Sequence, residues 1–262
     1  MNGIYTIIVC LLLLSSCSTR IQKEEKENLD AKSLLQGIWM DEMTETPLFQ
    51  IKGDTIYYVD ESVTPVAFKI IGDSLRTYGL QTSSYHIKKQ EEFSFWIQSV
   101  VGDILKLSKI DNEIDSILVV QSSPINQEPA KEVIQKDDVV YYSNVRYRGY
   151  VYINPTDIKV IQPGISEEGL EVENVYYDNI IHICVYEGKN RLFGKDVKKQ
   201  DFVTLIPDEY YQRAILSDMD FVGVTEKGYQ YQATVCVPNS ASCYLVNISI
   251  SFNGDINYEL AQ

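Results

Sequence analysis

Three Gly-Asp pairs, each lying between two apolar segments, constrain the fold of this chain more than any other feature of its sequence. The pairs are Gly53-Asp54, Gly72-Asp73 and Gly102-Asp103. Gly supplies the positive φ that a tight turn needs, and Asp satisfies backbone groups within the turn. Two apolar segments around such a turn predict a β-hairpin. We therefore expect residues 34–120 to form an antiparallel β domain, a meander that is closed or nearly closed.

A polar segment with two prolines follows this region. It predicts a linker over residues 121–136, with a short polar helical turn from Lys131 to Lys136. Residues 137–262 are expected to form an α+β domain with an antiparallel sheet and one short helix. The fold class expected for the whole chain is thus mainly β with some α.

The helix of this second half is predicted over residues 206–216. Pro207 suits a first helical turn, and the two acids after it complement the positive helix N-terminus. Pro155 and Pro163-Gly164 are expected to interrupt the strands. The predicted strands of this half are residues 139–142, 145–153, 180–186, 229–237, 244–252 and 256–260.

Two of the predicted strands carry a cysteine on their more polar face, Cys236 and Cys243. If the strands pair through a loop over residues 237–242, the two cysteines stand opposite each other and can form a disulfide. Cys184 is then a buried free thiol in an apolar strand. A bond from Cys184 to either of the others, and three free thiols, are the alternatives.

The N-terminus has the features of a signal for export and lipid attachment. Residues 4–14 are apolar but too short to span a bilayer, and they fit a signal peptide. The run Leu14-Ser15-Ser16-Cys17 resembles the lipobox of bacterial lipoproteins, which implies cleavage after residue 16 and lipid on Cys17. Residues 17–33 are charged and are expected to be a disordered tether. Gln22-Lys23-Glu24-Glu25 resembles a surface-export signal, so either a periplasmic or a cell-surface orientation of an outer-membrane lipoprotein fits.

The charge of the chain excludes some partners. A formal net charge of −14 repels phosphates, so we expect no nucleic-acid binding. The same charge disfavours direct adhesion to anionic lipid headgroups. Membrane attachment is therefore expected through the lipid on Cys17 alone.

The motifs that would identify a reaction are missing from the sequence. The two histidines, His86 and His182, have no zinc-ligand spacing, and there is no Cys-x-x-Cys, nucleophile elbow or phosphate loop. His182 and Cys184 share a strand face, which is more typical of a buried thiol beside a satisfied imidazole than of a catalytic pair. We expect no enzyme activity, no cofactor and no metal. Three further clusters are interpreted as solvated surface: Asp111–Asp115, Glu167-Glu168, and Lys195 with Lys198 and Lys199.

Two further resemblances extend this reading. Gly37-x-Trp39 resembles the opening of lipocalin-like domains, in which Trp closes one end of the barrel. The whole chain resembles an uncharacterised lipoprotein family of Bacteroides and its relatives. This likeness rests on the lipobox, the Gly-Asp hairpins, the run Asp178–Ile183 and the stretch Phe221–Tyr244. The resemblance implies a location in the cell envelope and implies no activity.

Three classes of function remain open. The first is a structural or protein-interaction subunit of the envelope. The second is a binding module for a small ligand or a glycan, either in the first half or on the Tyr-rich strands. The third is an enzyme with an unrecognised site. A pocket would favour the second class, an exposed apolar patch the first, and perturbed acids in a cleft the third.

Overall fold

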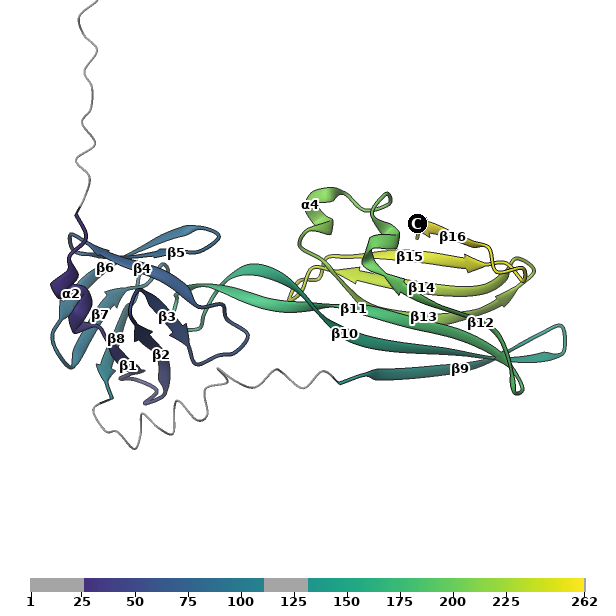
Figure 1. The fold of residues 1–262 in the computed structure, drawn as a ribbon, viewed down its shortest axis with the longest axis horizontal. Helices are drawn as coiled ribbons and strands as arrows, with labels where there is room; N and C mark the ends of the chain where they lie inside the picture. Colours follow the sequence, from purple (N-terminus) through teal and green to yellow (C-terminus); the bar gives the residue numbers. More distant parts are fainter. Residues whose placement is uncertain (1–25, 111–131, 262) are drawn as a thin grey trace, which may run out of the picture.

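The computed structural model describes residues 26–110 and 132–261, and it confirms a mainly β fold with little helix. Figure 1 shows an elongated molecule with a β-barrel at one end and two facing sheets at the other. A long hairpin joins the two parts. The predicted signal peptide and Cys17 lie outside the described residues.

The first part is a closed barrel of eight antiparallel strands in sequence order, and β1 closes it by pairing with β8. This confirms the predicted antiparallel meander and shows that it closes. The Gly-Asp pairs lie in the turns between β2 and β3, between β4 and β5, and between β7 and β8. The strands are β1 Gly37–Asp41, β2 Pro47–Lys52, β3 Thr55–Tyr58, β4 Val66–Ile71, β5 Ser74–Tyr78, β6 Thr82–Gln90, β7 Ser94–Gln98 and β8 Ile104–Lys109.

Large apolar side chains fill the inside of the barrel. Alternate residues of the strands point inward, as in Phe95 and Ile97 of β7, and both are buried. Trp39 is completely buried against Phe95, with ring centroids 5.6 Å apart, and its indole N–H donates a 2.8 Å hydrogen bond to the Leu35 carbonyl. The barrel is therefore a packed core.

A short helix, α2 (Leu29–Leu34), precedes the barrel and corrects the predicted tether of residues 17–33. The Asn28 side chain caps the helix by accepting a hydrogen bond from the Ala31 amide. Lys32 is buried, and its Nζ lies 2.6 Å from both Glu27 and Asp54. Burial alone would lower the pKa of Lys32, but the hydrogen bonds to these two carboxylates outweigh it and raise the pKa. Ion pairing thus orders the end of a segment whose composition suggested disorder.

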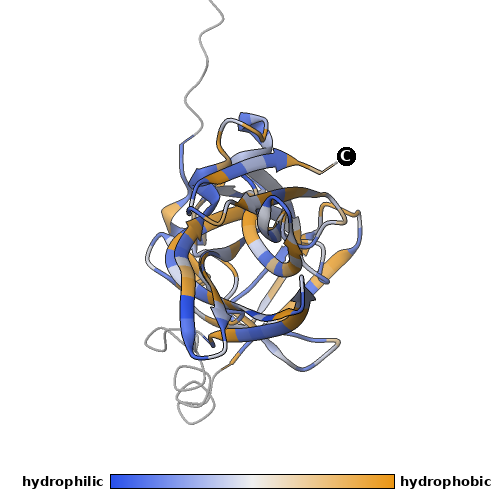
Figure 2. Cartoon of the chain, turned by 90° about the vertical axis from the view of Figure 1, so that its right-hand side faces the viewer, coloured by the Kyte–Doolittle hydropathy of each residue, from blue (hydrophilic) through white to orange (hydrophobic). Residues whose placement is uncertain are grey.

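The second part is two four-stranded antiparallel sheets that face each other across one hydrophobic core. The predicted antiparallel pairing is confirmed, but the strands form two sheets and not one. Figure 2 shows hydrophilic and hydrophobic positions alternating along the strands, as expected where only one face of each sheet is buried. One sheet has the order β12-β11-β10-β9, formed by Ile134–Tyr142 (β9), Val145–Ile165 (β10), Glu171–Glu187 (β11) and Asn190–Lys198 (β12). The other has the order β13-β14-β15-β16, formed by Ile215–Thr225, Gly228–Cys236, Cys243–Ile250 and Ile256–Leu260.

Strands β10 and β11 run far beyond their own sheet, past the predicted breaks at Pro155 and Pro163-Gly164. The pairing shifts between Pro155 and Lys159, so an irregularity absorbs the first proline, which has no N–H to give to the ladder. Pairing then continues to Ile165 and Glu171. The result is the hairpin that reaches the barrel in Figure 1.

The connection between the two sheets contains a 3-10 turn, Lys199–Phe202, and one short helix, α4 (Asp208–Tyr211). The helix begins at Asp208, two residues after the predicted start, and it is much shorter than the predicted residues 206–216. Ile215 and Leu216 instead begin β13, where they pair with Cys236 and Val235. Leu216 is completely buried, so tertiary packing overrides the local helical pattern.

The predicted linker over residues 121–136, with its helical turn, needs a second correction. Residues 134–136 belong to β9, where they pair with Ile153, Tyr152 and Val151. Lys136 also reaches the facing sheet, with its Nζ 2.6 Å from Asp218 and 3.0 Å from Asp220. The rest of the predicted linker lies mostly outside the described residues. Within residues 26–110 and 132–261, no helix has the length and apolar character that crossing a membrane requires.

Candidate functional site

The tip of the β10–β11 hairpin closes one end of the barrel. Leu170 and Val172 of the tip are buried within the barrel core, and Leu170 is only 4% exposed. Gly169 allows this approach, because its φ is +75° and a Cβ there would lie 2.9 Å from the side chain of Ser99. The second half of the chain therefore completes the core of the first.

Backbone hydrogen bonds hold the tip in place. The Val100 amide donates to the Gly169 carbonyl at 3.0 Å, and the Thr64 amide donates to the Glu173 carbonyl at 2.8 Å. The Val175 amide donates to the Ser62 carbonyl at 2.6 Å, so the segment before β4 pairs with β11 as an added edge. The tip is paired as well as packed.

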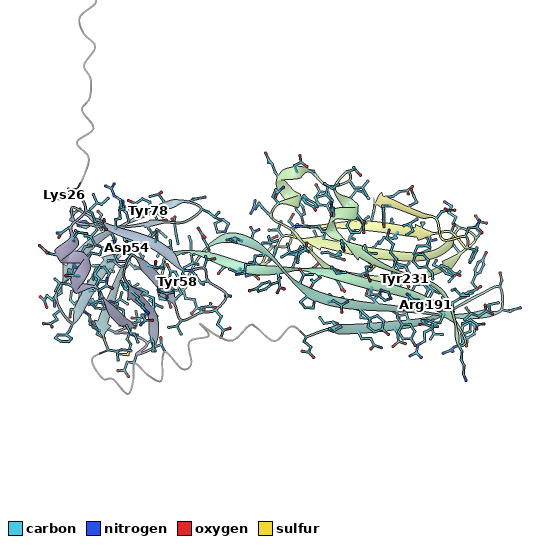
Figure 3. The ribbon with its side chains drawn as sticks, viewed as in Figure 1. Lys26, Asp54, Tyr58, Tyr78, Arg191 and Tyr231 are labelled. Atoms are coloured by element: carbon cyan, nitrogen blue, oxygen red, sulfur yellow. A yellow bond between two sulfur atoms is a disulfide. The ribbon has the colours of Figure 1, made fainter. Side chains whose placement is uncertain are left out.

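Two cavities lie beside the hairpin tip. One has a volume of about 210 Å³ and is lined by Tyr58, Leu80, Ile165, Glu171 and Glu173 among others. The other measures about 520 Å³ and is lined by Leu48, Asp60, Glu167, Glu168 and Asn174 among others. Tyr58 borders both cavities, and Figure 3 places it on the side of the barrel nearer the hairpin. Burial raises the pKa of the Tyr58 hydroxyl, and the nearby Tyr85 and Glu173 raise it further, so it is a neutral donor at ordinary pH.

A second candidate site is the outer side of the sheet β12-β11-β10-β9. Val151 and Ile153 of β10 point into the core, so the alternate residues of that strand point outward. We call this outer surface the aromatic face. Its members are Arg148, Tyr150, Tyr152, His182, Tyr186 and Arg191.

The rings of the aromatic face contact one another along and across the strands. The Tyr150 and Tyr152 rings are stacked with centroids 6.1 Å apart, and Tyr186 meets Tyr150 edge-on at 5.7 Å. The Arg148 guanidinium lies 4.9 Å from the centre of the Tyr150 ring and pairs with Asp137. The rings are thus held in fixed positions, which lowers the entropy lost when a partner binds.

Both ring nitrogens of His182 have a polar partner. Its Nδ1 lies 2.6 Å from Asp196, and its Nε2 lies 3.3 Å from the Arg191 guanidinium. With the proton on Nδ1, the neutral ring donates to Asp196 and accepts from Arg191. Figure 3 shows Arg191 on the sandwich, far from the barrel.

Cys184 lies on the same strand face as His182 and is the free, buried thiol that the sequence predicted. It pairs across the strands with Gly194, over which the Arg191 side chain lies. Burial raises the pKa of the Cys184 thiol, and Arg191 only partly opposes this. A protonated, covered thiol is a poor nucleophile, so the geometry gives no support to a Cys/His catalytic pair.

The outer side of the other sheet has a different character. It carries Gln230, Gln232, Asn247 and Ser249, which bond to one another rather than present rings. The Gln232 amide donates to Asn247 at 2.9 Å, and the Ser249 hydroxyl donates to Gln230 at 2.7 Å. Only one of the two outer faces therefore has the composition of an interface, in which Tyr and Arg are enriched.

The predicted disulfide between Cys236 and Cys243 is confirmed, and the two residues are direct partners between β14 and β15. The predicted basic surface patch is wrong for Lys199 only, because Lys198 is exposed and Lys195 is half-buried. Lys199 is buried, and its Nζ donates to the Ala214 carbonyl at 2.7 Å, while Lys195 donates to the Tyr258 hydroxyl at 3.0 Å. Asp111–Asp115 lie outside the described residues. The described ranges contain no group of three His, Cys, Asp or Glu side chains able to hold a metal ion.

The sequence patterns did not point to two acids at the contact between the hairpin tip and the barrel, Glu171 and Glu173, which we call the junction acids. They pointed to Glu167-Glu168 instead, and these lie at the tip beside the larger cavity. Alternation of Glu with Val from residue 171 to 173 indicates a strand with one polar side, but no local signal shows that this side meets the barrel.

Fold and sites together define a two-part, mainly β protein, in which a hairpin of a β-sandwich closes a packed eight-stranded barrel. Residues 114–258 match the family model described as a domain of unknown function, DUF4738. Because the match spans more than half of the chain, the protein belongs to this family. The matched region contains the sandwich and the hairpin but not the barrel strands. A search of curated proteins found no match.

Proposed function

We propose that this protein is a non-enzymatic lipoprotein of the bacterial cell envelope that binds a protein partner through the aromatic face. The observation that carries the proposal is the contrast between the two outer faces of the sandwich. One presents preordered tyrosines with two arginines, and the other presents small amides and hydroxyls bonded to each other. Tyr and Arg dominate the binding energy of protein interfaces.

The location of the protein at the outer membrane is part of the same proposal. Lipid on Cys17 would hold the protein at the outer membrane, facing either the periplasm or the cell surface. Residues 18–25 would separate the barrel from the membrane, since α2 begins at Leu29. We further propose membership of a Bacteroides-type lipoprotein family, which is supported by the lipobox and the envelope features of the sequence.

A lipocalin-like origin of the first half is supported by its strand order and by the buried Trp39 in β1. A ligand inside the barrel is not supported, because fifteen buried side chains fill the barrel and its closed end. The alternative of a small-ligand or glycan binding module is favoured by the two cavities at the junction. Among the residues that the structure describes, no arrangement of side chains supports the enzyme alternative.

The experiment is site-specific photo-crosslinking in intact cells. A benzophenone amino acid replaces Tyr186 on the aromatic face, and the control places it at Gln232 on the opposite outer face. We expect a discrete adduct from position 186 and none from position 232. Wild-type protein co-expressed in the same cells should compete for the adduct, whereas the co-expressed variant Tyr150→Ser/Tyr152→Ser should not. Equal adducts from both faces, or none from position 186, would refute the proposal.

A further inference from the structure

Arginines gather at one end of the aromatic face, although the chain as a whole has a net charge of −14. Tyr186 stands between two of them, because it pairs with Arg148 of β10 and with Arg191 of β12. Arg146 is the outward residue of β10 that precedes Arg148, and it is exposed. This basic end of the aromatic face lies far from the barrel, where Figure 3 labels Arg191.

Two acids border the same surface, and each already has a partner. Asp137 accepts a 2.6 Å hydrogen bond from the Arg148 guanidinium. Asp196 lies 2.6 Å from Nδ1 of His182. Neither carboxylate is therefore left to neutralise the other arginines.

Arg146 and Arg191 have donors to spare. In residues 26–110 and 132–261, neither of them forms an ion pair with a carboxylate. The polar contacts of Arg191 are Nε2 of His182 at 3.3 Å and the Phe193 carbonyl at 3.5 Å. A guanidinium carries five N–H donors in a fork that matches a carboxylate. Both side chains can thus bind carboxylates of a partner.

The rings beside these arginines favour negative charge as well. The Tyr150 ring lies between Arg148 and Tyr152 along β10, with the guanidinium 4.9 Å from its centre and the Tyr152 ring stacked on it. Strand side chains stand roughly perpendicular to the sheet, so rings stacked along a strand turn their edges and hydroxyl groups to the solvent. The edge of an aromatic ring is positive, whereas a sugar stacks on a ring face. The covered faces of Tyr150 therefore favour a carboxylate-bearing protein over a glycan.

We propose that the partner of the aromatic face is an acidic protein segment. Its carboxylates bind the guanidiniums of Arg146 and Arg191, and its apolar side chains lie against the tyrosine rings. This inference rests on the proposed function, because it names the chemistry of the partner that binds the same face.

The experiment selects binders from random twelve-residue peptides displayed on phage, with the full-length mature protein as the target. Peptides that also bind Tyr150→Ser/Tyr152→Ser are removed, so the remaining peptides depend on the aromatic face. We expect these peptides to be net negative, with at least two Asp or Glu residues. General attraction would give the opposite result, because a chain with a net charge of −14 attracts basic peptides.

The possible results separate this inference from the proposed function. Peptides that depend on the face but are neutral or basic would refute the acidic partner and leave protein binding by this face intact. If no peptide depends on the face, both proposals are contradicted. An acidic glycan is the rival occupant, and polygalacturonate fragments should bind at least tenfold more weakly than the selected peptides. Equal or tighter binding of the glycan would overturn a protein segment as the occupant.

A matched pair of variants tests the two arginines. Arg146→Gln/Arg191→Gln should weaken binding of a selected peptide at least tenfold. Lys52→Gln/Lys88→Gln removes the same charge from exposed positions of the barrel and should leave binding unchanged. Equal weakening by both pairs would mean general repulsion and would refute the site. If the loss of Arg191 exposes Cys184 to a thiol reagent, Arg146→Gln alone must still lower the affinity.

Discussion

The closure of the barrel by the hairpin predicts that a single truncation in the second half of the chain destabilises the first half. Leu170 is 4% exposed and packs in the barrel core, although it lies far from β1–β8 in the sequence. Leu→Ala at a buried site costs about 2–5 kcal/mol. The tip can relax partly at the end of the barrel, so we expect a loss of about 2–3 kcal/mol.

Urea unfolding followed by tryptophan fluorescence measures this loss in the barrel specifically. The chain has two tryptophans, and both Trp39 and Trp96 lie in barrel strands. With a denaturant slope of about 1.5 kcal/mol/M, the unfolding midpoint of Leu170→Ala should fall by about 1.3–2 M. Thiol accessibility of Cys184 reports the sandwich in the same samples. That transition should move less than the fluorescence transition.

Ile165→Ala is the matched control, because Ile165 lies on the same hairpin but is 60% exposed. Surface substitutions of this kind change stability by about 0.5 kcal/mol or less. A tryptophan midpoint that shifts equally in the two variants would show that the tip does not contribute to the barrel core, and the reasoning would be wrong.

Three further predictions follow from other parts of the molecule. Reduction of the Cys236–Cys243 bond, or Cys236→Ser/Cys243→Ser, should lower the stability of the sandwich by only about 2–3 kcal/mol, because a short closed loop contributes less than a long one. Without reduction, peptide mapping should find Cys184 as the one reactive thiol among residues 184, 236 and 243, and only after denaturation. Above pH about 10 the free energy of unfolding should fall, because burial raises the folded-state pKa of Tyr58, Tyr85 and Tyr231 and these hydroxyls therefore ionise first in the unfolded chain. Urea midpoints at pH 8 and pH 11 measure the effect, and equal midpoints would contradict it. Intact mass of the mature protein should show loss of residues 1–16 and a diacylglyceryl group on Cys17, whereas a product that retains Met1 would exclude the lipobox interpretation.

The sequence by itself determined the parts of this protein that depend on local chemistry. The Gly-Asp pairs predict the positions of the barrel hairpins, because Gly adopts the positive φ that these tight turns need. The alternation of apolar and polar residues in residues 229–237 and 244–252 set the register that brings Cys236 opposite Cys243. Pro207 marked the start of α4 for the same reason, since its fixed φ suits a first turn.

Tertiary contacts decided the remaining features. Ion pairs of Lys32 with Glu27 and Asp54 fold a charged segment that has little apolar surface of its own. Leu216 extends a strand and not a helix, because the sandwich core buries it completely.

The candidate sites show the same division. Tyr150 and Tyr152 alternate in β10 and so share one side of the strand, but only the packing of the two sheets shows that this side lies outside. The alternation around Glu171 and Glu173 indicates a strand with one polar side, but nothing in the sequence shows that this side meets the barrel. Glu171 meets Ser83 at a separation of 88 residues and Glu173 meets Leu80 at a separation of 93 residues, and local patterns carry no information about such distant contacts.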